Sequence, residues 1–594
     1  MSATPETTSG AEASSTTRAD TIALGVFVCT ALACYGRLYF GVDLTDDAYY
    51  AALPWSFVLG HTPLVDEWAV HQLAALLLVP AVATWRAIVG SADGLMLFLR
   101  HLHFAAALGV AFVVASWLRA RFDRRIAWLC ASVVVAYVPF HMPALSYNTI
   151  TSLSFTAGLV LLARAATAAR PMALQAGAAS SLGLAGFSYP PMAVVGGVAL
   201  LTSLALARVR RDERMLGRLV LATAGPIVVF GALAAGLLAA AGGLAALEGP
   251  MALNEALGTQ GGGAAKVRQL YDEVAWTAPF FVGLLVWVGL LLLVTLHLEA
   301  AAMLALGCAI LALLPFLYQG LALPINEPHT TAPFYWMALG FAAPFVMRGA
   351  RDAGDEAAGV DLRLVVLPAI LAGLVIAWAT ANGLRNTPLG LLPAAIAAVA
   401  GVAHHIAAKP AGALARSASS FVVVALVVFQ LLQYWDVTYR NGRVDQLTTP
   451  VVSGPWAGIR TTEQRAGLLA QLAADLERAG AGASTLISID YLPAGYLLSD
   501  LRPLTSALWT FPDFCCQGTP EVRHVYARRF EGDGARPDVI LDNQCLFTED
   551  RVTGLGRPPE LPPDPLRATL FERRYVVTAR HPCYTIRRAV EPGS

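Results

Sequence analysis

Apolar runs long enough to cross a hydrocarbon core of about 30 Å recur along most of this 594-residue chain and constrain its fold more than any other feature. We assign thirteen spans by this criterion. They lie at residues 21–40, 95–118, 126–140, 150–166, 172–187, 192–207, 219–244, 276–298, 300–318, 334–347, 364–379, 389–402 and 421–435. Only 14% of the residues are charged, against about a quarter in an average globular protein. We therefore predict a polytopic α-helical membrane protein with about 13 transmembrane helices.

The charged residues are concentrated after the last span. Residues 437–594 hold 36 of the 82 charged residues, and this segment is long enough to form one soluble domain. Its pattern predicts an amphipathic helix at 461–480, with Thr461 and Gln464 placed for a capping box. Strands are predicted where β-branched and aromatic residues gather, at 485–489, 539–541, 575–579 and 584–587. We therefore expect a C-terminal α/β domain.

The segment before the first span and the overall charge indicate two further properties of the chain. Residues 1–20 are rich in Ser, Thr, Ala and Glu and lack a cleavable-signal layout, which predicts a disordered cytosolic tail. The transmembrane domain then covers 21–436 and the α/β domain 437–594. The net charge is zero, and the sequence has no Walker A or GxGxxG motif and no basic stretch with interleaved aromatic residues. We therefore expect neither nucleotide nor nucleic-acid binding.

Polar residues of the C-terminal segment admit several arrangements. Its four cysteines allow three connectivities if all of them pair, and a bond between the adjacent Cys515 and Cys516 would be strained, which favours separate pairing with Cys545 and Cys583. Asp490 and Asp542 follow predicted strand ends, where ligand-binding residues often lie. Turn chemistry explains an aspartate there equally well, so we assign neither a catalytic role.

The distribution of basic residues predicts the orientation. With the N-terminus in the cytosol, seventeen basic residues fall in inner segments, whereas the outer loops before residue 436 hold only Arg86, Lys266, Arg268 and Arg385. An odd number of spans then places the C-terminal domain outside. This orientation requires the apolar segment 72–89 to lie along the outer face or dip into it, since counting it as a crossing would invert every later segment. We therefore predict an integral protein of the cell (inner) membrane with a cytoplasmic N-terminus and an extracytoplasmic C-terminal domain.

The first outer loop, residues 41–94, contains two pairs of neighbouring carboxylates, Asp46–Asp47 and Asp66–Glu67. Adjacent carboxylates repel each other, which raises the pKa of at least one and suits it to accept a proton as a general base. A structural alternative is that Thr45 caps a helix whose first turn holds Asp46 and Asp47, where negative charge suits the helix dipole. The second acidic pair and the adjacent apolar segment favour a site at the lipid surface.

Further polar residues of the outer face are candidates for substrate binding. Arg100 falls near the outer end of a span, where it either snorkels or faces a carboxylate or a phosphate. Lys266 and Arg268 follow a glycine run in the outer loop 248–274, which is either a mobile lid or a plain connector. The remaining candidates lie in outer turns between spans and are Tyr147, Asn148 and His329.

These features resemble the membrane-embedded C-type glycosyltransferases (GT-C), in particular the class of the protein O-mannosyltransferases and the lipid A aminoarabinose transferase. The most specific residues are Asp46-Asp47-Ala48-Tyr49-Tyr50, followed by Gly60-His61-Thr62-Pro63 and an apolar stretch leading to Arg100. The resemblance implies a GT-C-like fold and an enzyme that moves a sugar from a polyprenyl-phosphate carrier to a cell-envelope acceptor, a glycan, lipid or protein, on the non-cytoplasmic face. The donor and the acceptor are thus the expected partners.

The resemblance implies a catalytic carboxylate at Asp46 or Asp47. It would deprotonate an acceptor hydroxyl that attacks the anomeric carbon with inversion, while a cationic group stabilises the departing phosphate. Arg100, Lys266 and Arg268 are the cationic candidates, in descending order. Some relatives use a divalent metal, and Mg²⁺ or Mn²⁺ could bind an oxygen site formed by Asp46, Asp47, Asp66 and Glu67.

Two other classes of function remain alternatives. A membrane transporter with an exported binding domain would place polar or broken helices near the membrane midplane, whereas the charges here gather at one face. An envelope assembly or sensor protein would use the acidic loop only to cap a helix and would transfer no sugar.

Overall fold

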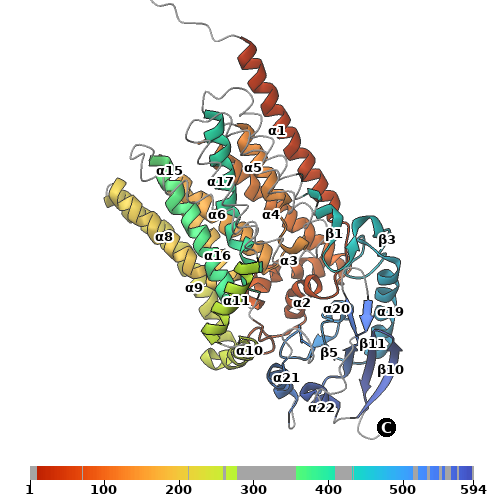
Figure 1. The fold of residues 1–594 in the computed structure, drawn as a ribbon. Coiled ribbons are helices and arrows are strands. Elements are labelled where there is room, and N and C mark those ends of the chain that lie inside the picture. The colour runs from red at the N-terminus through yellow and green to blue at the C-terminus, as the bar shows by residue number, and fades with distance from the viewer. Residues whose placement is uncertain are drawn as a thin grey trace, which may run out of the picture.

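A helical bundle contacts a smaller sheet domain at one of its ends in this computed structural model (Figure 1). The structure describes residues 10–69, 71–122, 124–211, 213–258, 262–276, 356–380, 382–408, 428, 431–432, 434–512, 519–531, 536–547, 552–554, 564–571 and 574–590. The fold class predicted from the apolar runs agrees with this arrangement in its coarse form, a polytopic helical protein with a C-terminal sheet.

The bundle consists mainly of apolar helices. Its helices are α1 (Gly10–Arg37), α2 (Asp46–Val58), α3 (Gln72–Val89), α4 (Leu95–Leu118), α5 (Arg124–Ala136), α6 (Tyr147–Thr167), α7 (Met172–Ser188), α8 (Pro191–Arg210), α9 (Glu213–Ala240), α15 (Glu356–Asp361), α16 (Leu367–Ala379) and α17 (Pro388–Ala408). Among the described residues, seven helices are long and apolar enough to cross a membrane. They are Arg18–Arg37, Gln72–Val89, Leu95–Leu118, Tyr147–Thr167, Pro191–Arg210, Glu213–Ala240 and Gly359–Ala379.

The predicted spans correspond to these helices unevenly. The predicted span 95–118 coincides with α4, whereas α5 and α7 have only 13 and 17 residues. Helix α5 ends before Pro139, and the chain then turns through η1 (Pro139–His141), in which Phe140 has a positive φ of 55°. The predicted spans 276–298, 300–318, 334–347 and 421–435 lie wholly or mostly outside the described residues. The expected number of thirteen spans therefore stays a prediction.

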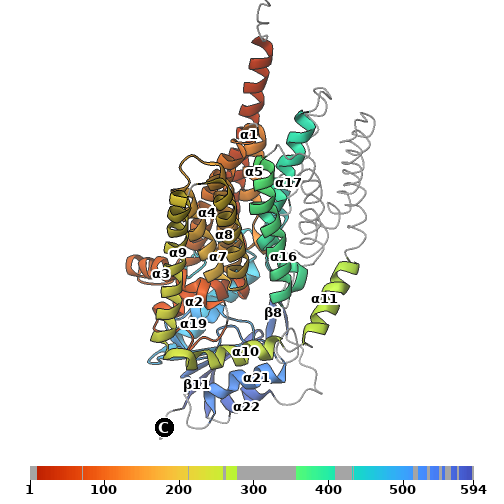
Figure 2. The same ribbon diagram turned by 90° about the vertical axis from the view of Figure 1, so that its left-hand side faces the viewer.

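Helix α3 is oriented differently from its neighbours. Figure 2 shows α3 running across the direction of α4, α8 and α9, at the end of the bundle that faces the sheet domain. Arg86 near its C-terminal end donates to the carbonyl of Val58 (3.1 Å) and lies over the Trp55 ring, which holds α3 against α2. The length and composition of α3 would allow it to cross a membrane, so the expectation that segment 72–89 lies along a membrane face stays a prediction.

The two ends of α4 have different surroundings. Helix α4 begins against the sheet domain, since the amide of Met96 donates to the carbonyl of Pro455 (3.0 Å), so its other end is remote from that domain. The basic residues of the connection after α4 lie at that remote end, and they are Arg119, Arg121, Arg124 and Arg125. The first predicted outer loop instead contacts the sheet domain, since the amide of Gly41 donates to the carbonyl of Arg460 (2.9 Å) and the amide of Trp68 to that of Ser506 (2.8 Å). The loop and the domain thus share one side, as the predicted topology requires.

The sheet domain is an α/β layer structure. Its strands are β1 (Val437–Thr438), β2 (Gly442–Arg443), β3 (Thr449–Pro450), β4 (Arg460–Thr461), β5 (Thr485–Ile489), β6 (Arg502–Pro503), β7 (Val539–Asn543), β8 (Cys545–Phe547), β9 (Val552–Gly554), β10 (Tyr575–His581) and β11 (Tyr584–Ala589). The main sheet has the order β10-β11-β7-β5-β6, in which β5 runs parallel to β6 and β7 and the other pairs are antiparallel. All four predicted strands are present.

Alternating side chains bury the two faces of this sheet. Leu486 and Leu541 pack with α19 (Glu463–Gly480) on one face, whereas Ile487 and Ile540 pack with α21 (Pro520–Ala527) and α22 (Pro565–Phe571) on the other. The predicted helix cap was wrong by one residue. Thr462 accepts from the amide of Arg465 (3.3 Å), whereas Thr461 lies in β4 and donates to Asn441 (2.8 Å).

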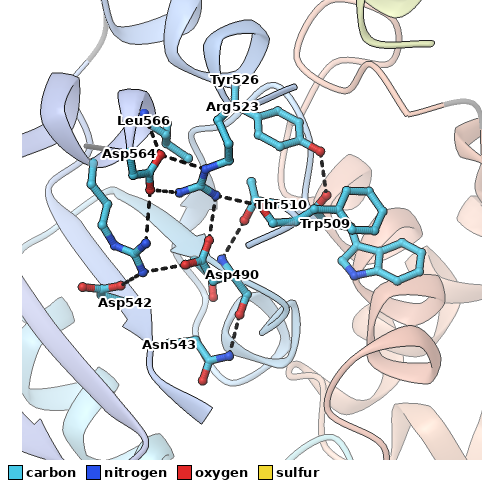
Figure 3. A network of polar contacts seen from close by, with 12 residues as sticks. Asp490, Trp509, Thr510, Arg523, Tyr526, Asp542, Asn543, Asp564 and Leu566 are labelled. Carbon is cyan, nitrogen blue, oxygen red and sulfur yellow. Dashed lines mark hydrogen bonds and ion pairs between the residues drawn. The ribbon is translucent and has the colours of Figure 1, made fainter. Parts of the chain in front are cut away.

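The cysteines and the two strand-end aspartates of this domain have defined partners. Cys545 and Cys583 form a disulfide with each other, so the separate pairing of Cys515 and Cys516 with them is wrong; Cys515 and Cys516 themselves lie outside the described residues. Asp490 and Asp542, at the ends of β5 and β7, both bind Arg567, through contacts of 2.5 and 2.8 Å (Figure 3). They are therefore members of an ion network inside the domain.

Candidate functional site

The predicted catalytic carboxylates lie at the N-terminus of α2, where the bundle meets the sheet domain. Helix α2 begins at Asp46, so Asp46 and Asp47 occupy its first turn as the helix-capping alternative predicted. Thr45 occupies the N-cap position as predicted, but Asp43 supplies the side-chain hydrogen bond to the helix amide. Asp43 accepts from the amide of Thr45 (3.1 Å), the hydroxyl of Thr45 (2.7 Å) and the amide of Asp47 (2.8 Å), whereas the Thr45 side chain makes no cap hydrogen bond.

Asp47 forms a buried ion pair with Arg100 of α4. The guanidinium Nη2 of Arg100 lies 2.9 Å from Asp47 Oδ2 and 2.8 Å from the carbonyl oxygen of Gly41. Its Nη1 donates to the carbonyls of Leu38 (2.8 Å) and Phe40 (3.2 Å), so it also satisfies the backbone where α1 ends. Because Arg100 is only 2% exposed, snorkelling is excluded and the carboxylate-facing alternative is confirmed.

Asp46 is bound by two residues that the sequence analysis did not identify, Tyr439 and Arg440. The Tyr439 hydroxyl donates to Asp46 Oδ2, and Arg440 Nη2 lies 3.4 Å from the same oxygen. Arg440 Nη1 also donates to the hydroxyl of Thr45 (2.6 Å). Both residues belong to the tight hairpin between β1 and β2, directly after the last predicted span. Their position at the exit of that span was the one sequence signal that could have found them.

This hairpin is held in a defined conformation. Arg440 has a positive φ of 49°, a region that costs a non-glycine residue on the order of 1–3 kcal/mol. Asn441 fixes the turn, because its side-chain oxygen accepts from the amide of Val42 (2.7 Å) and from the Thr461 hydroxyl (2.8 Å). The backbone at residue 41 approaches Thr438 so closely that only glycine fits, because a Cβ atom on Gly41 would lie 2.8 Å from the Cβ of Thr438. The local strain thus presents Tyr439 and Arg440 to Asp46.

One oxygen of each of these two carboxylates remains available. Asp46 Oδ1 and Asp47 Oδ1, which we call the open oxygens, are buried and find no hydrogen-bond partner among the described residues. Burial raises the pKa of Asp46 to about 6, although the charge of Arg440 works in the opposite direction. Burial also raises the pKa of Asp47, and Arg100 opposes that shift. Asp46 is therefore a carboxylate that ionises near neutral pH and keeps one acceptor atom unused.

The second acidic pair, Asp66 and Glu67, serves other contacts. Asp66 pairs with Arg529 of the sheet domain, which helps to lower its pKa against the effect of burial. Glu67 is fully buried and accepts from the amides of Ala69 and Leu508, each at 3.0 Å. Burial raises the pKa of Glu67 to about 8, so it is mostly protonated at neutral pH. Both residues fasten the first loop to the sheet domain.

The four predicted metal-binding carboxylates do not converge. The described part of the chain contains no group of three or more His, Cys, Asp or Glu side chains that could hold a metal ion. Asp46 and Asp47 each have an arginine partner, and Asp66 and Glu67 are engaged by the sheet domain. The expected site formed by Asp46, Asp47, Asp66 and Glu67 is therefore wrong as a ligand set. Guanidinium groups supply the positive charge beside these aspartates.

Aromatic side chains surround the same helix end. Tyr147, one of the predicted substrate-binding residues, lies 4.5 Å from His71 and 5.6 Å from Tyr50 between ring centroids. Tyr49 lies 5.0 Å from Trp509 of the sheet domain. We call Tyr49, Tyr50, His71, Tyr147 and Trp509 the aromatic cluster. Asn148, also predicted, is buried in the first turn of α6 directly after Tyr147.

The other predicted cationic residues make contacts elsewhere. The loop 248–274 contains two helices, α10 (Glu248–Gly258) and α11 (Gly262–Trp276). Lys266 of α11 donates to the carbonyl of Thr380 and to the Gln269 side chain (2.9 Å), which joins α11 to the end of α16. Arg268 is largely exposed and lies 4.0 Å from Asp272 one turn later. The structure thus does not bring either residue to Asp46. His329 lies outside the described residues.

Comparisons with known proteins give similarity in structure but not in sequence. No protein-family model matches the sequence, and no curated protein sequence matches it. The oligosaccharyltransferase of Archaeoglobus fulgidus, solved in complex with Zn and sulfate, is similar with a TM-score of 0.46 and 11% identity over 87% of this chain and 68% of that one. The same archaeal protein, AglB, solved with an inhibitory peptide and a dolichol-phosphate, is also similar with a TM-score of 0.46 and 11% identity over 88% and 69% of the two chains.

A second solved protein is similar over almost the full length of both chains. ArnT from Cupriavidus metallidurans, bound to undecaprenyl phosphate, has a TM-score of 0.37 and 14% identity over 95% of this chain and 97% of that one. The names of these two proteins, an oligosaccharyltransferase and ArnT, lie within the range of the resemblance expected from the sequence, at identities of 11% and 14%. At these identities the likeness describes the path of the chain, and the residues of this protein must carry any functional proposal.

Proposed function

We propose that this protein is a membrane glycosyltransferase that moves a sugar from a polyprenyl-phosphate carrier to a hydroxyl of a cell-envelope acceptor on the non-cytoplasmic face. The observation that carries the proposal is the pair of open oxygens on Asp46 and Asp47, buried between the bundle and the sheet domain. A buried carboxylate without its full set of partners is costly, so its retention indicates a use. The motif Asp46-Asp47-Ala48-Tyr49-Tyr50 supports the reaction class by resemblance.

Asp46 is the better candidate for the general base. Its oxygen Oδ2 is fixed by Tyr439 and Arg440, which leaves Oδ1 to accept the proton of the acceptor hydroxyl. The acceptor oxygen then bonds to the anomeric carbon as the bond from that carbon to the phosphate oxygen breaks, and the polyprenyl phosphate leaves with the electron pair. Direct displacement of this kind inverts the anomeric configuration.

Asp47 and Arg100 fit a supporting role. Both terminal nitrogens of Arg100 donate to Asp47 and to three backbone carbonyls, so few of its donors are free to bind a phosphate. The pair instead fixes the first turn of α2 against α1 and α4. We therefore assign Asp47 to positioning and keep Asp46 for proton transfer.

Arg440 is the candidate for contact with the departing phosphate. Its side chain is 26% exposed, whereas Arg100 is buried, and it lies beside the proposed base. A guanidinium offers donors in a planar fork that matches phosphate oxygens. A cation placed there would stabilise the charge that develops on the leaving group. This assignment replaces Lys266 and Arg268, which the structure keeps in other contacts.

The test is transfer by the purified protein in phospholipid nanodiscs. A panel of radiolabelled polyprenyl-phosphate sugars is offered together with a cell-envelope extract, and glycosylated product, released polyprenyl phosphate and anomeric configuration are measured. We expect one donor to give product with inverted configuration. The double variant Asp46→Asn, Asp47→Asn is expected to give none, whereas Asp272→Asn, the same change on an exposed helix, retains transfer. Movement of a solute without product would favour a transporter, and no turnover of any donor would favour an assembly or sensor protein.

A further inference from the structure

We propose that the aromatic cluster is a binding subsite for an uncharged sugar ring, which names the substrate class of the function proposed above and rests on it. The cluster adjoins the proposed base on the same helix, since Tyr49 and Tyr50 follow Asp46 within its first turns. It combines residues of α2, α3, α6 and the sheet domain, so it lies where the bundle and that domain meet.

Polar atoms inside the cluster lack partners. Tyr49 Oη, His71 Nδ1 and Trp509 Nε1, which we call the open ring atoms, are buried and form no hydrogen bond with any described residue. Tyr49 itself is fully buried. Tyrosine and tryptophan in a core normally satisfy their polar atoms, and a purely structural cluster could use phenylalanine without cost. Three such atoms in one cluster indicate a ligand with hydroxyl groups.

The chemistry of the cluster fits a sugar. The C–H faces of a pyranose pack on flat aromatic rings, while its hydroxyls can donate and accept at the ring edges. Trp509 and His71 keep part of their surface exposed, so the cluster is not sealed inside the core. The open ring atoms supply donors from Tyr49 and Trp509 at the edges of two rings that are tilted by 39° to each other, with centroids 5.0 Å apart.

The charges around the cluster favour an uncharged ring. Asp46 is paired with Arg440 and Asp47 with Arg100, so the charge of each carboxylate is already balanced by a guanidinium and no net negative charge remains to attract an ammonium group. Burial raises the pKa of Glu67 to about 8 and lowers that of His71 to about 4, so both side chains are mostly neutral at pH 7. A uronate would bring a further negative charge next to these two carboxylates.

The sheet domain holds Trp509 in place. The carbonyl of Trp509 accepts from the Tyr526 hydroxyl (3.4 Å), and Arg523 donates to the carbonyl of Phe511 (3.0 Å). The amide of Asp490 donates to the hydroxyl of Thr510 (2.8 Å). Figure 3 shows the Trp509 ring pointing away from this network toward the ribbon of the N-terminal helices. The ion network therefore positions one wall of the proposed subsite.

Saturation-transfer NMR on the full chain in phospholipid nanodiscs tests the subsite without requiring turnover. The probes are the methyl pyranosides of mannose, glucose and galactose, methyl glucuronide as the anionic arm and methyl glucosaminide as the cationic arm. We expect saturation transfer to the ring protons of a neutral probe. Tyr49→Phe and Trp509→Phe each remove one open ring atom and should raise the dissociation constant about 3- to 10-fold, the range for one lost hydrogen bond. Tyr271→Phe, on exposed α11, should leave it unchanged.

A merely structural role gives a different result. Because the Tyr49 hydroxyl makes no hydrogen bond to the described protein, Tyr49→Phe should leave the thermal midpoint unchanged or raise it. The proposal is overturned if no neutral probe binds, if both variants bind as the wild type does, or if a charged probe binds at least as tightly. Sugar binding without any transfer would contradict the proposed function alone, and transfer with unaltered binding in both variants would contradict the subsite alone.

Discussion

The molecule contains two buried clusters of aspartates and arginines that differ in how completely they are satisfied. In the sheet domain, Asp490 binds Arg523 (2.6 Å) and Arg567 (2.5 Å) through its two oxygens (Figure 3). Asp564 likewise has both oxygens bound, by the same two arginines. At the start of α2, Asp46 and Asp47 each bind an arginine with one oxygen and leave the other open.

This difference separates a structural network from a candidate site. Buried charges that satisfy one another stabilise a particular arrangement but leave nothing for a ligand. The network of the sheet domain therefore has a sufficient structural role, because it holds the segment that contains Trp509. The cluster at α2 has unused acceptors and a strained neighbour, Arg440, which the fold alone does not explain.

The largest expected effect is on stability, in the satisfied network. Arg523→Ala leaves Asp490 and Asp564 without their main partner, and removing one member of a buried ion pair costs about 3–5 kcal/mol. The thermal midpoint of the protein in nanodiscs should fall accordingly. The matched control is Arg580→Ala on the exposed edge strand β10, which should change stability by less than about 0.5 kcal/mol. Equal midpoints for the two variants would show that the network contributes nothing.

The next effect is on rate, in the unsatisfied cluster. Arg440→Gln removes the cation that we assign to the leaving phosphate, and loss of one group of this kind typically lowers kcat about 10²- to 10³-fold. Steady-state transfer kinetics measure the change, and Arg440→Lys should restore part of it because a charge remains. A kcat within twofold of the wild type for Arg440→Gln would exclude a role in leaving-group stabilisation.

A smaller effect concerns pH. Asp46, whose pKa burial raises to about 6, accepts a proton only when it is ionised. The transfer rate should therefore be constant above that pH and fall about tenfold for each pH unit below it. Because the charge of Arg440 lowers the pKa of Asp46, residual activity in Arg440→Gln should fall with a midpoint at higher pH than in the wild type. A midpoint that moves the other way, or a flat profile down to pH 4, would contradict the assignment of the base.

The smallest effect is expected at Lys266, which the sequence offered as a phosphate ligand. Lys266→Met removes the hydrogen bonds from α11 to Thr380 and Gln269, which should cost about 1 kcal/mol. The KM for the lipid-linked donor should stay unchanged, and donor titration of the transfer reaction measures it. A KM raised tenfold with an unchanged thermal midpoint would instead indicate that Lys266 binds the lipid-linked donor.

The sequence predicted most of the local structure and only half of the cluster at α2. Apolar runs and strand patterns located α4 and β5 to the residue, because burial in lipid or in a sheet imposes its own periodicity. The acidic pair and Arg100 were identifiable because charges next to a span need an explanation. Tyr439 and Arg440 were not, since their approach to Asp46 depends on a contact across nearly 400 positions of the chain, at a sequence separation of 393 for Tyr439.

The same limit explains the predictions that the structure changed. Adjacency in the first loop suggested that Asp66 and Glu67 join Asp46 and Asp47 at one metal site. In the folded chain, the backbone of Leu508 and the side chain of Arg529 bind the second pair instead. Spacing along a loop does not reveal which partner a later domain will supply.

The most direct test of the central claim is the transfer rate per folded molecule of Asp46→Asn, measured together with its thermal midpoint. The carbonyl oxygen of the amide can still accept from Tyr439 and Arg440, and Arg440 is partly exposed, so the midpoint should fall only slightly below that of the wild type. Loss of the proton acceptor should lower the rate about 10²- to 10⁴-fold. A rate within threefold of the wild type, or a loss of rate that only follows a loss of folded protein, would contradict the account.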